Sequence, residues 1–382
     1  MSTQMMKAVQ QHAFGGPEVL SYEDAPMPVL QAGEVLVQVH AVGVNPPDSY
    51  LRDGYQQLPP EWRPEVRFPL ILGTDLSGVV VARADDVREV AVGDEVYAMA
   101  RFPEGAAGGS RAYAEYVSVP VSDLARKPLT LSHQQAAAVP MSLLTAWQFM
   151  IDPGHEVANP LQPGPHRPVP LAGKRVLVNG AAGGVGHFAV QLAKWQGAEV
   201  IAVAAGRHEA FLRQLGADSV IDYTTTAVEE TVRDLDLVID APGGPASGRF
   251  LRTLRPGGAL YPIFPLGFAG AEEARQRGVT VSTTQVRSSG AQLARLADLL
   301  DAGVIQVAID SVFPLAQVQM AHERAAQGHL EGKIVLSVMD SSAGNPRRPG
   351  LRFCFSRRRT KTAPAGQDGP ARCSAPRPLR SG

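Results

Sequence analysis

Apolar and polar positions change their spacing along the chain, and the change divides the chain into two regions. In the second region, short apolar runs rich in β-branched residues alternate with segments whose apolar residues recur every three or four positions. The short runs predict strands at residues 175–179, 199–204, 219–222, 235–240, 258–264, 309–313 and 333–338. The other segments predict helices at residues 185–195, 209–215, 292–301 and 316–326. Strands that alternate with helices indicate a parallel, doubly wound sheet.

The first region, residues 7–130, has few long amphipathic segments. Short β-branched stretches lie between Gly, Pro and Asp, for example at residues 34–41, 78–82 and 94–99. This pattern predicts an all-β, barrel-like unit. A helical period follows at residues 131–150, for which Ser132 is a candidate N-cap. Six prolines between residues 152 and 173 then predict an irregular surface connection.

The length and composition fit a soluble protein of two domains. The chain has 382 residues, more than one core usually contains, of which 45% are hydrophobic and 19% charged. No apolar run approaches the roughly 18 to 20 residues of a membrane span, and the first residues lack the pattern of a secretory signal. We therefore expect a cytoplasmic protein with no membrane partner.

The charge is distributed unevenly. Residues 339–382 contain ten Lys and Arg against two Asp and Glu, whereas the preceding 338 residues contain 26 against 35. The basic tail is rich in Arg, Pro, Ser and Gly without an apolar period, so we expect it to be disordered. The acidic body is unlike a nucleic-acid-binding domain, although the tail could hold polyanions weakly. We expect no nucleic-acid partner for the body.

Cysteine and histidine positions bear on metal binding. Both cysteines, Cys354 and Cys373, lie in the tail, which excludes a disulfide and a cysteine-ligated zinc site in the body. The histidines are scattered without the spacing of metal ligands. The sequence therefore predicts no metal site.

A glycine-rich turn joins the predicted strand 175–179 to the predicted helix 185–195. It contains Gly180, Gly183, Gly184 and Gly186. Glycines at such a junction let backbone N–H groups approach a pyrophosphate, which the positive end of the helix dipole also attracts. A turn that binds nothing would show the same pattern, but four glycines in seven residues cost backbone entropy without a packing gain. We predict that this turn binds a dinucleotide.

The end of the next predicted strand indicates which dinucleotide binds. Folds that prefer NAD place an Asp or Glu there, about 20 residues after the glycines, to hold the ribose 2′-hydroxyl. Here the strand ends at Ala204, and Arg207 follows without an intervening acid. A guanidinium pairs with a 2′-phosphate, which a carboxylate would repel. We predict that the chain binds NADPH rather than NADH. The alternative is that Arg207 is only a solvated residue at the start of a helix.

Eight short motifs occur in a fixed order along the chain. They are GVNPPDSYLRDG (43–54), GTDLSG (73–78), VGDEVYA (92–98), AYAEYV (112–117), LTAWQ (144–148), NGAAGGVG (179–186), LRPGG (254–258) and GKIVL (332–336). In this order they resemble the zinc-independent quinone oxidoreductases of the medium-chain dehydrogenase/reductase superfamily, which include zeta-crystallin-like proteins. The resemblance covers about residues 5–338.

The resemblance implies a fold and an assembly. A GroES-like β-barrel catalytic domain would be followed by a Rossmann domain with a doubly wound parallel sheet, after which the chain returns to the first domain. The implied limits are residues 1–135, 136–285 and 286–338, with the basic tail at 339–382. The cofactor would lie in the cleft between the domains, and the protein would be a homodimer.

The resemblance also implies site residues. Zinc-using relatives carry a cysteine where this chain has Asn45 to Asp48, and a His-Glu pair where it has Thr74 and Asp75. Neither set of ligands is present, so the chemistry would be metal-free, and Asp48 would stabilise a turn. Asn45 and Tyr50 would line the substrate side of the nicotinamide, although Tyr50 could equally be an ordinary half-buried tyrosine. The implied cofactor contacts are Thr145 near the nicotinamide ring, Gly183, Gly184 and Val185 at the pyrophosphate, Tyr223 near the 2′-phosphate, and Lys333. Thr145 could equally be a residue that only packs its helix.

The expected activity is reduction of a quinone, an enone or a related carbonyl-conjugated substrate by NADPH. Asn45 and Tyr50 would hydrogen-bond the oxygen on which negative charge develops. A non-catalytic NADPH-binding redox sensor or structural protein is the alternative. Residues 56–67, 102–111 and 152–173 depart from the family pattern by their length and their Pro or Gly content, and we expect the first two to border the substrate cleft.

Overall fold

The fold contains two large sheets joined by helices. The structure is a computed structural model that describes residues 4–104, 111–162 and 164–339. The predicted disordered tail, apart from Met339, and both cysteines lie outside these residues. Among the described residues, no helix is long and apolar enough to cross a membrane.

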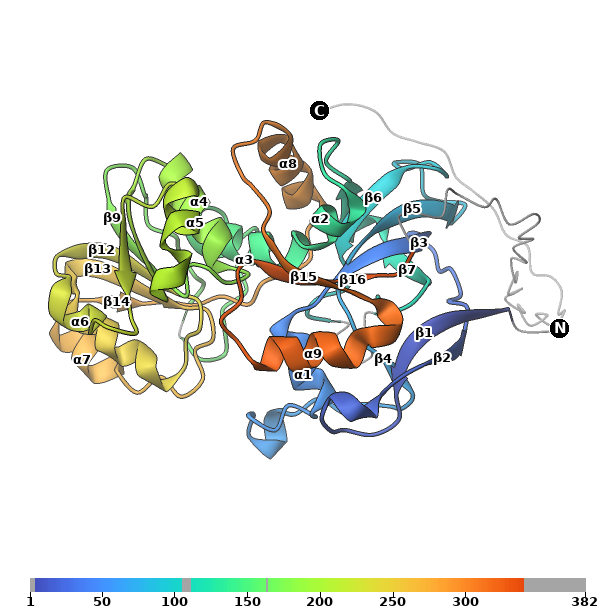
Figure 1. The fold of residues 1–382 in the computed structure, drawn as a ribbon, viewed down its shortest axis with the longest axis horizontal. Helices are drawn as coiled ribbons and strands as arrows, with labels where there is room; N and C mark the ends of the chain where they lie inside the picture. Colours follow the sequence, from blue (N-terminus) through green and yellow to red (C-terminus); the bar gives the residue numbers. More distant parts are fainter. Residues whose placement is uncertain (1–3, 105–110, 163, 340–382) are drawn as a thin grey trace, which may run out of the picture. The chain divides into compact units, whose positions relative to one another are not determined.

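The first large sheet is the predicted doubly wound one. Its six strands pair in parallel in the order β11-β10-β9-β12-β13-β14, so the chain builds outward from β9 on one side and then from β12 on the other. Helices α4, α5, α6 and α7 connect or flank these strands (Figure 1). The strands are β9 (Arg175–Asn179), β10 (Glu199–Ala204), β11 (Ser219–Asp222), β12 (Leu235–Asp240), β13 (Leu254–Pro262) and β14 (Thr280–Val281). The helices are α4 (Gly186–Trp195), α5 (Glu209–Gln214), α6 (Val228–Thr231) and α7 (Ala271–Gln276).

The strand order determines where a ligand can bind. It is the order of a Rossmann fold, in which the direction of winding reverses between the first and fourth strands. Here these are β9 and β12, whose carboxyl ends carry Asn179 and Asp240. The amide of Asn179 donates a hydrogen bond to Asp240 Oδ1 at 2.7 Å. Crevices at such a reversal are the usual ligand sites of open α/β sheets.

The second large sheet forms the barrel-like unit. Its strands follow the order β15-β16-β3-β5-β6-β8, with β7 also paired to β3, and a smaller sheet has the order β2-β1-β4. Strand β16, near the end of the described chain, pairs antiparallel with β3 near its beginning, as the orange and blue strands of Figure 1 show. The strands are β1 (Met5–Gln11), β2 (Leu20–Pro26), β3 (Glu34–Gly43), β4 (Leu70–Ile71), β5 (Asp75–Arg83), β6 (Glu95–Met99), β7 (Tyr116–Pro120), β8 (Leu124–Arg126), β15 (Ile309–Pro314) and β16 (Lys333–Ser337).

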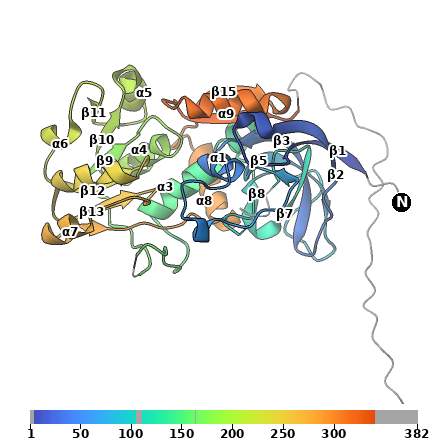
Figure 2. The same cartoon turned by 90° about the horizontal axis from the view of Figure 1, so that it is seen from below.

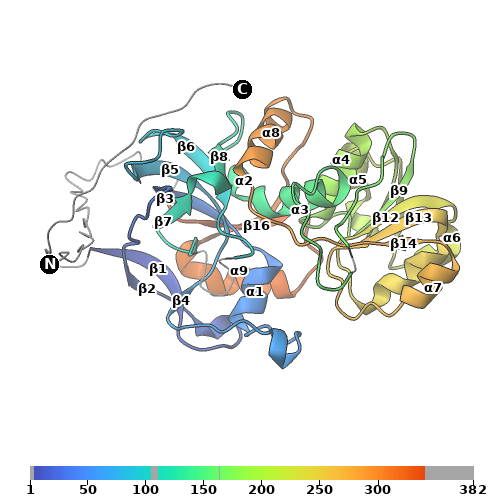
Figure 3. The same cartoon turned by 180° about the vertical axis from the view of Figure 1, so that it is seen from behind.

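Five helices pack on or between the two sheets. α3 lies between the barrel and the Rossmann sheet in Figure 3 and contacts both β6 and α4. Every one of its residues is buried. α8 packs on β8, and α9 packs on β15 and β16 (Figure 2). These helices are α1 (Pro46–Arg52), α2 (His133–Ala137), α3 (Pro140–Met150), α8 (Gly290–Asp301) and α9 (Val318–Ala326). A helix buried on all sides joins the two sheets through one apolar core.

The predicted fold class is confirmed, and most predicted elements lie within two residues of the observed ones. Strand β13 begins four residues before the predicted 258–264, because the LRPGG turn is part of the strand. Helix α1 was not predicted; it begins at Pro46 and Pro47, and prolines are tolerated in the first turn of a helix. The connection 152–173 is not purely on the surface, because His166 and Leu171 are buried. The domain limits stay predictions.

We expect Leu144→Ala in α3 to lower the free energy of unfolding by about 2–5 kcal/mol, because it removes a fully buried side chain from the shared core. Urea denaturation measures the change. Leu129→Ala is the matched control, since Leu129 is 91% exposed. If both variants were equally stable, the packing of α3 would not contribute to the core that joins the two sheets.

Candidate functional site

Two cavities with a common wall lie between the Rossmann sheet and the barrel. One, of about 700 Å³, contains the glycine turn, and we refer to it as the glycine-turn cavity. The other, of about 780 Å³, is lined by several aromatic side chains, and we refer to it as the aromatic cavity. The residues that line both are Asn45, Pro46, Tyr50, Ser142, Val185, Ala241 and Pro242.

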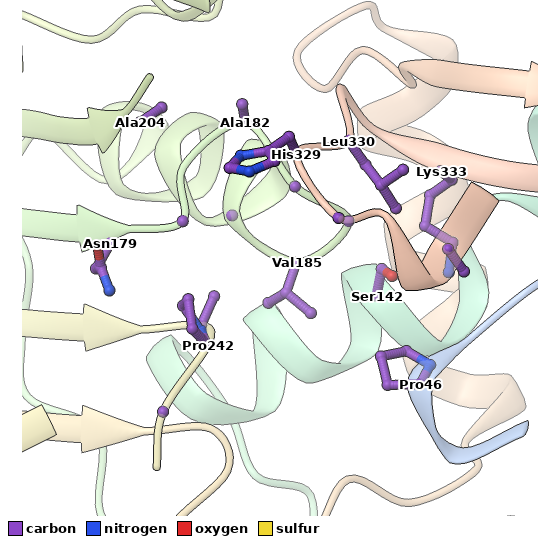
Figure 4. Close-up of a pocket in the computed structure, with 18 of the residues that line it drawn as sticks. Pro46, Ser142, Asn179, Ala182, Val185, Ala204, Pro242, His329, Leu330 and Lys333 are labelled. Carbon is purple, nitrogen blue, oxygen red and sulfur yellow. The ribbon is translucent and has the colours of Figure 1, made fainter. Parts of the chain in front are cut away.

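The glycine-turn cavity lies at the carboxyl ends of the parallel strands. Figure 4 shows Asn179 and Ala204 at strand ends on one side and Leu330 and Lys333 from the returning chain on the other. The returning chain is tied to the turn, because Gly332 N donates to the Ala182 carbonyl oxygen at 2.8 Å. The crevice predicted by the strand order is therefore closed by residues from the C-terminal part of the barrel.

The turn fits a bound dinucleotide. Gly180 has φ +70°, which side-chain-bearing residues rarely adopt, and a Cβ on Gly186 would lie 2.1 Å from the Gly180 carbonyl oxygen. Within the described residues, no backbone hydrogen bond engages the N–H groups of Gly184, Val185 or Gly186 at the start of the ten-residue helix α4. Free N–H groups at a helix N-terminus are suited to hold a pyrophosphate.

Polar groups from three segments meet at the rim of this cavity. The hydroxyl of Tyr223 lies 3.1 Å from His329 Nδ1, and Arg207 Nη2 donates to the His329 carbonyl oxygen at 3.3 Å. Tyr223 and His329 line the cavity, whereas Arg207 is exposed beside it. His329 has φ +53° and was not predicted, because its loop joins the site only through the return of the chain.

An acid from the neighbouring strand lies at this corner. The end of β10 has no acid, as noted from the sequence; parallel pairing, however, places Asp222 of β11 opposite Ala204. Its Oδ1 accepts hydrogen bonds from the Thr224 hydroxyl at 2.6 Å and the Thr224 N–H at 2.9 Å. These bonds, with one from the Gly206 N–H, hold the pKa of Asp222 below its ordinary value. The carboxylate is therefore an ionised, already hydrogen-bonded part of the turn after β11.

Lys333 and Asn45 connect the returning chain to the common wall. The Lys333 ammonium is fully buried and donates to the Val44 carbonyl oxygen at 2.9 Å and to Asn45 Oδ1. The Asn45 amide nitrogen lies 3.5 Å from Thr74 Oγ1 and 3.4 Å from the Gly43 carbonyl oxygen, and the Asn45 side chain also hydrogen-bonds the Asp75 carboxyl group. Lys333 and Asp75 thus fix the orientation of the Asn45 amide in the common wall.

Two buried carboxyl groups lie near this lysine. Burial raises the pKa of Asp48 to about 6 and that of Asp75 to about 7, while the Lys333 charge lowers both. Asp48 accepts from the Asn45 N–H at 2.8 Å and from the Tyr113 hydroxyl at 3.1 Å. It therefore caps the start of α1, as the sequence analysis expected of a turn-stabilising residue. Burial lowers the pKa of Lys333 itself.

Tyrosine hydroxyls supply the uncommitted donors of the aromatic cavity. Tyr50 and Tyr55 both line it, their ring centroids are 6.3 Å apart, and their hydroxyls have no hydrogen-bond partner among the described residues. Burial raises the pKa of both, that of Tyr55 to about 12, so both hydroxyls keep their protons at neutral pH. Tyr55 was not predicted; its place next to the RDG turn, five residues after Tyr50, is a sequence signal that could have found it.

Comparison with known proteins places this architecture in a family. Residues 31–129 match the alcohol dehydrogenase GroES-like domain, and residues 215–336 match the zinc-binding dehydrogenase family. A mitochondrial NAD(P)H oxidoreductase of Danio rerio is 33% identical over an alignment of 362 residues; the match covers 86% of this chain and 90% of that protein. The chain belongs to the medium-chain dehydrogenase/reductase superfamily.

Quinone oxidoreductases are among the relatives of this medium-chain dehydrogenase/reductase. The solved structure of the quinone oxidoreductase from Coxiella burnetii superposes with a TM-score of 0.74 at 31% identity, covering 88% of this chain and all of that chain. A chloroplastic NADPH-dependent alkenal/one oxidoreductase of Arabidopsis thaliana is 30% identical over an alignment of 343 residues, and the match covers 87% of this chain and 79% of that protein. The chain is therefore a nicotinamide-dependent oxidoreductase. The organelle names of these relatives give the expected cytoplasmic location no support.

The superfamily includes zinc enzymes, which raises the question of a metal in this member. Asp48 and Asp75, which stand nearest to the zinc-ligand positions, are engaged by protein N–H groups, Asp75 by the Met141 N–H at 3.0 Å. In the part of the chain that the structure describes, no three His, Cys, Asp or Glu side chains lie so that they could hold a metal ion. These two carboxyl groups serve to position backbone and Asn45 instead.

The structure gathers all but one of the predicted site residues around the two cavities. The residues lining the glycine-turn cavity are Asn45, Tyr50, Gly180, Gly183, Gly184, Val185, Gly186, Tyr223 and Lys333. Thr145 lines the aromatic cavity and donates to the Met141 carbonyl oxygen at 2.7 Å. Arg207 lines neither cavity. Ser142, three residues before Thr145 on α3, lines both and was not predicted, although helical spacing puts it on the same face.

We expect Asp75→Asn to flatten the pH dependence of stability. The pKa of Asp75 is about 7 when folded, above its ordinary value of 3.8, so its stabilising contribution is present at low pH and is lost as the pH rises through 7. Between pH 5.5 and 8 the wild type should lose on the order of 2 kcal/mol of unfolding free energy that the variant retains.

Urea midpoints at several pH values measure this difference, and Asp85→Asn, at an exposed position, is the control. Parallel pH profiles for wild type and Asp75→Asn would show that Asp75 is ionised throughout this range.

Proposed function

We propose that this protein is a metal-free, NADPH-dependent oxidoreductase that reduces a quinone, an enone or a related carbonyl-conjugated substrate. The observation that carries the proposal is the common wall of the two cavities. It brings the glycine turn, the amide of Asn45 and the free hydroxyl of Tyr50 to one place. The relatives' names, an NAD(P)H oxidoreductase, a quinone oxidoreductase and an alkenal/one oxidoreductase, support the same chemistry.

Residues of the glycine-turn cavity would hold the cofactor. The N–H groups of Gly184, Val185 and Gly186 would bind the pyrophosphate, and Ser142 and Thr145 would border the nicotinamide end. When bound, the reduced nicotinamide supplies a hydride, that is, two electrons and a hydrogen nucleus. The protein has to hold the acceptor beside that position and exclude water from it.

Asn45 and Tyr50 would act on the acceptor. As hydride reaches the β-carbon of an enone, the electron pair of the C=C bond shifts and negative charge develops on the carbonyl oxygen. Donors from the Asn45 amide and the Tyr50 hydroxyl would stabilise that charge. A proton from Tyr50 or from solvent then completes the α-carbon, so the products are the saturated ketone and NADP⁺. Lys333 keeps the Asn45 amide in the donating orientation.

The preference for NADPH over NADH rests on the rim of the cavity. Arg207, Tyr223 and His329 supply donors there, whereas the oxygens of Asp222 already accept bonds from Thr224 and Gly206. The Arg207 guanidinium and the Tyr223 hydroxyl would hydrogen-bond the 2′-phosphate of NADPH. NADH has no 2′-phosphate and could not make these bonds. A homodimer is proposed from the family resemblance, and a cytoplasmic location from the sequence.

A non-catalytic NADPH-binding sensor is the second candidate. Oxidation of NADPH, followed at 340 nm with a panel of quinones and enones, separates the two. Turnover with any acceptor of the panel supports the enzyme, whereas tight NADPH binding without turnover across the panel supports the sensor.

We expect Arg207→Glu to raise the KM for NADPH by about tenfold or more and to leave the KM for NADH nearly unchanged, because only the 2′-phosphate would meet the new charge. Steady-state kinetics with both cofactors measures the split. Arg213→Glu, an exposed arginine of α5 away from the cavity, is the matched control. Equal changes for both cofactors would remove Arg207 from the NADPH site.

We expect Tyr50→Phe to reduce kcat by about 10²–10⁴ if Tyr50 donates the proton, because general acids contribute that much. Loss of less than about tenfold would assign the proton to solvent. The variant keeps the ring contact with Phe264, whose centroid lies 5.8 Å away, so packing is preserved. A thermal denaturation curve that matches the wild type checks this.

A further inference from the structure

The aromatic cavity is lined by all three segments that depart from the family pattern. Residues Gln57, Leu58 and Trp62 come from 56–67, Phe102 and Pro103 from 102–111, and Asn159, Pro160 and Leu161 from 152–173. Only the first two were expected from the sequence to border the substrate cleft. Segments separated by up to about a hundred residues thus converge on the side of Asn45 and Tyr50 away from the glycine turn.

The lining differs in charge from that of the neighbouring cavity. Among the described residues that line the aromatic cavity, none has an ionisable Asp, Glu, Lys, Arg or His side chain. The glycine-turn cavity, in contrast, is lined by Arg52, Asp240, Arg249 and Lys333. A charged group entering the aromatic cavity would lose its hydration without gaining an ionic partner, which is costly. The cavity therefore discriminates against charged acceptors.

The same lining favours apolar surface. Trp62 is 49% and Leu161 44% exposed in the free protein, so a ligand that covers them removes apolar area from water. Phe102 and Phe149 are buried lining residues, and the ring centroid of Phe264, which also lines the cavity, lies 5.8 Å from that of Tyr50. A volume of about 780 Å³ lies in the range of cavities that enclose ligands much larger than a short enone.

We propose that the three divergent segments make the aromatic cavity selective for neutral acceptors with a bulky apolar substituent, and that Leu161 and Trp62 are specificity residues. The reactive carbonyl lies at Asn45 and Tyr50, and the substituent extends along the cavity toward Leu161. This inference rests on the proposed function. It adds the class of acceptor, which is long-chain or polycyclic, apolar and uncharged.

The test is a homologous series of enones with one reactive group and alkyl tails of one to seven carbons, together with the longest tail ending in a carboxylate. In the full-length protein with NADPH, kcat/KM should rise about two- to fourfold for each added methylene that becomes buried. The carboxylate should lose at least about 100-fold relative to its neutral counterpart. A flat series, or a carboxylate as good as the neutral enone, overturns the proposal.

Leu161→Glu and Trp62→Ala test the assigned residues. Each should lower the ratio of kcat/KM for the longest tail to that for the shortest by about tenfold. Leu129→Glu, at a 91% exposed leucine that lines neither cavity, should leave the ratio unchanged. A ratio unaffected by both cavity variants overturns their role as specificity residues, and thermal denaturation shows whether each variant is folded.

Failure of the proposed function has a different signature. If no enone is turned over, binding of the matching saturated ketones to the NADPH-loaded protein is measured by calorimetry. Affinity that grows with tail length supports the apolar cavity even though the proposed reaction is then wrong. Affinity independent of tail length overturns the cavity proposal as well.

Discussion

The bond between Lys333 and Asn45 joins residues 288 positions apart, and the candidate site depends on it. It exists because β16 returns to the barrel and pairs with β3, which delivers Lys333 beside the start of α1. A buried ammonium needs acceptors, and here they are the Val44 carbonyl and the Asn45 amide. Because an unpaired buried charge is unfavourable, these two hydrogen bonds hold the returning chain against the common wall and the barrel.

Around this bond the protein separates two environments. On one side the carboxyl ends of the parallel strands, the free N–H groups before α4 and several charged side chains suit an anionic dinucleotide. On the other side the lining residues that the structure describes include six aromatic side chains and no Asp, Glu, Lys, Arg or His. Tyr50, Ser142 and Val185 belong to both, so the boundary is only a few side chains thick. This separation would let a charged cofactor and the proposed apolar acceptor meet without exposing either to the other's surroundings.

Asp48 and Asp75 are buried acids whose hydrogen-bond partners are groups of the protein itself. Each carboxyl group accepts a protein N–H bond, and the Lys333 charge partly offsets the burial that raises their pKa values. Asp48 also accepts a hydrogen bond from the Tyr113 hydroxyl. This bond fixes the start of α1 and hence the position of Tyr50. The acids of this superfamily member therefore position other groups.

The sequence by itself determined the strand and helix alternation, the glycine turn and the eight motifs, because spacing and turn chemistry are local properties. Strands β9, β10, β11 and β12 were predictable to the residue for the same reason. Only the tertiary structure decided that Asp222 lies beside Ala204, that His329 joins the nucleotide rim, and that three divergent segments line one cavity. These relations depend on parallel pairing and on the return of β16, which bring together residues that no local pattern connects.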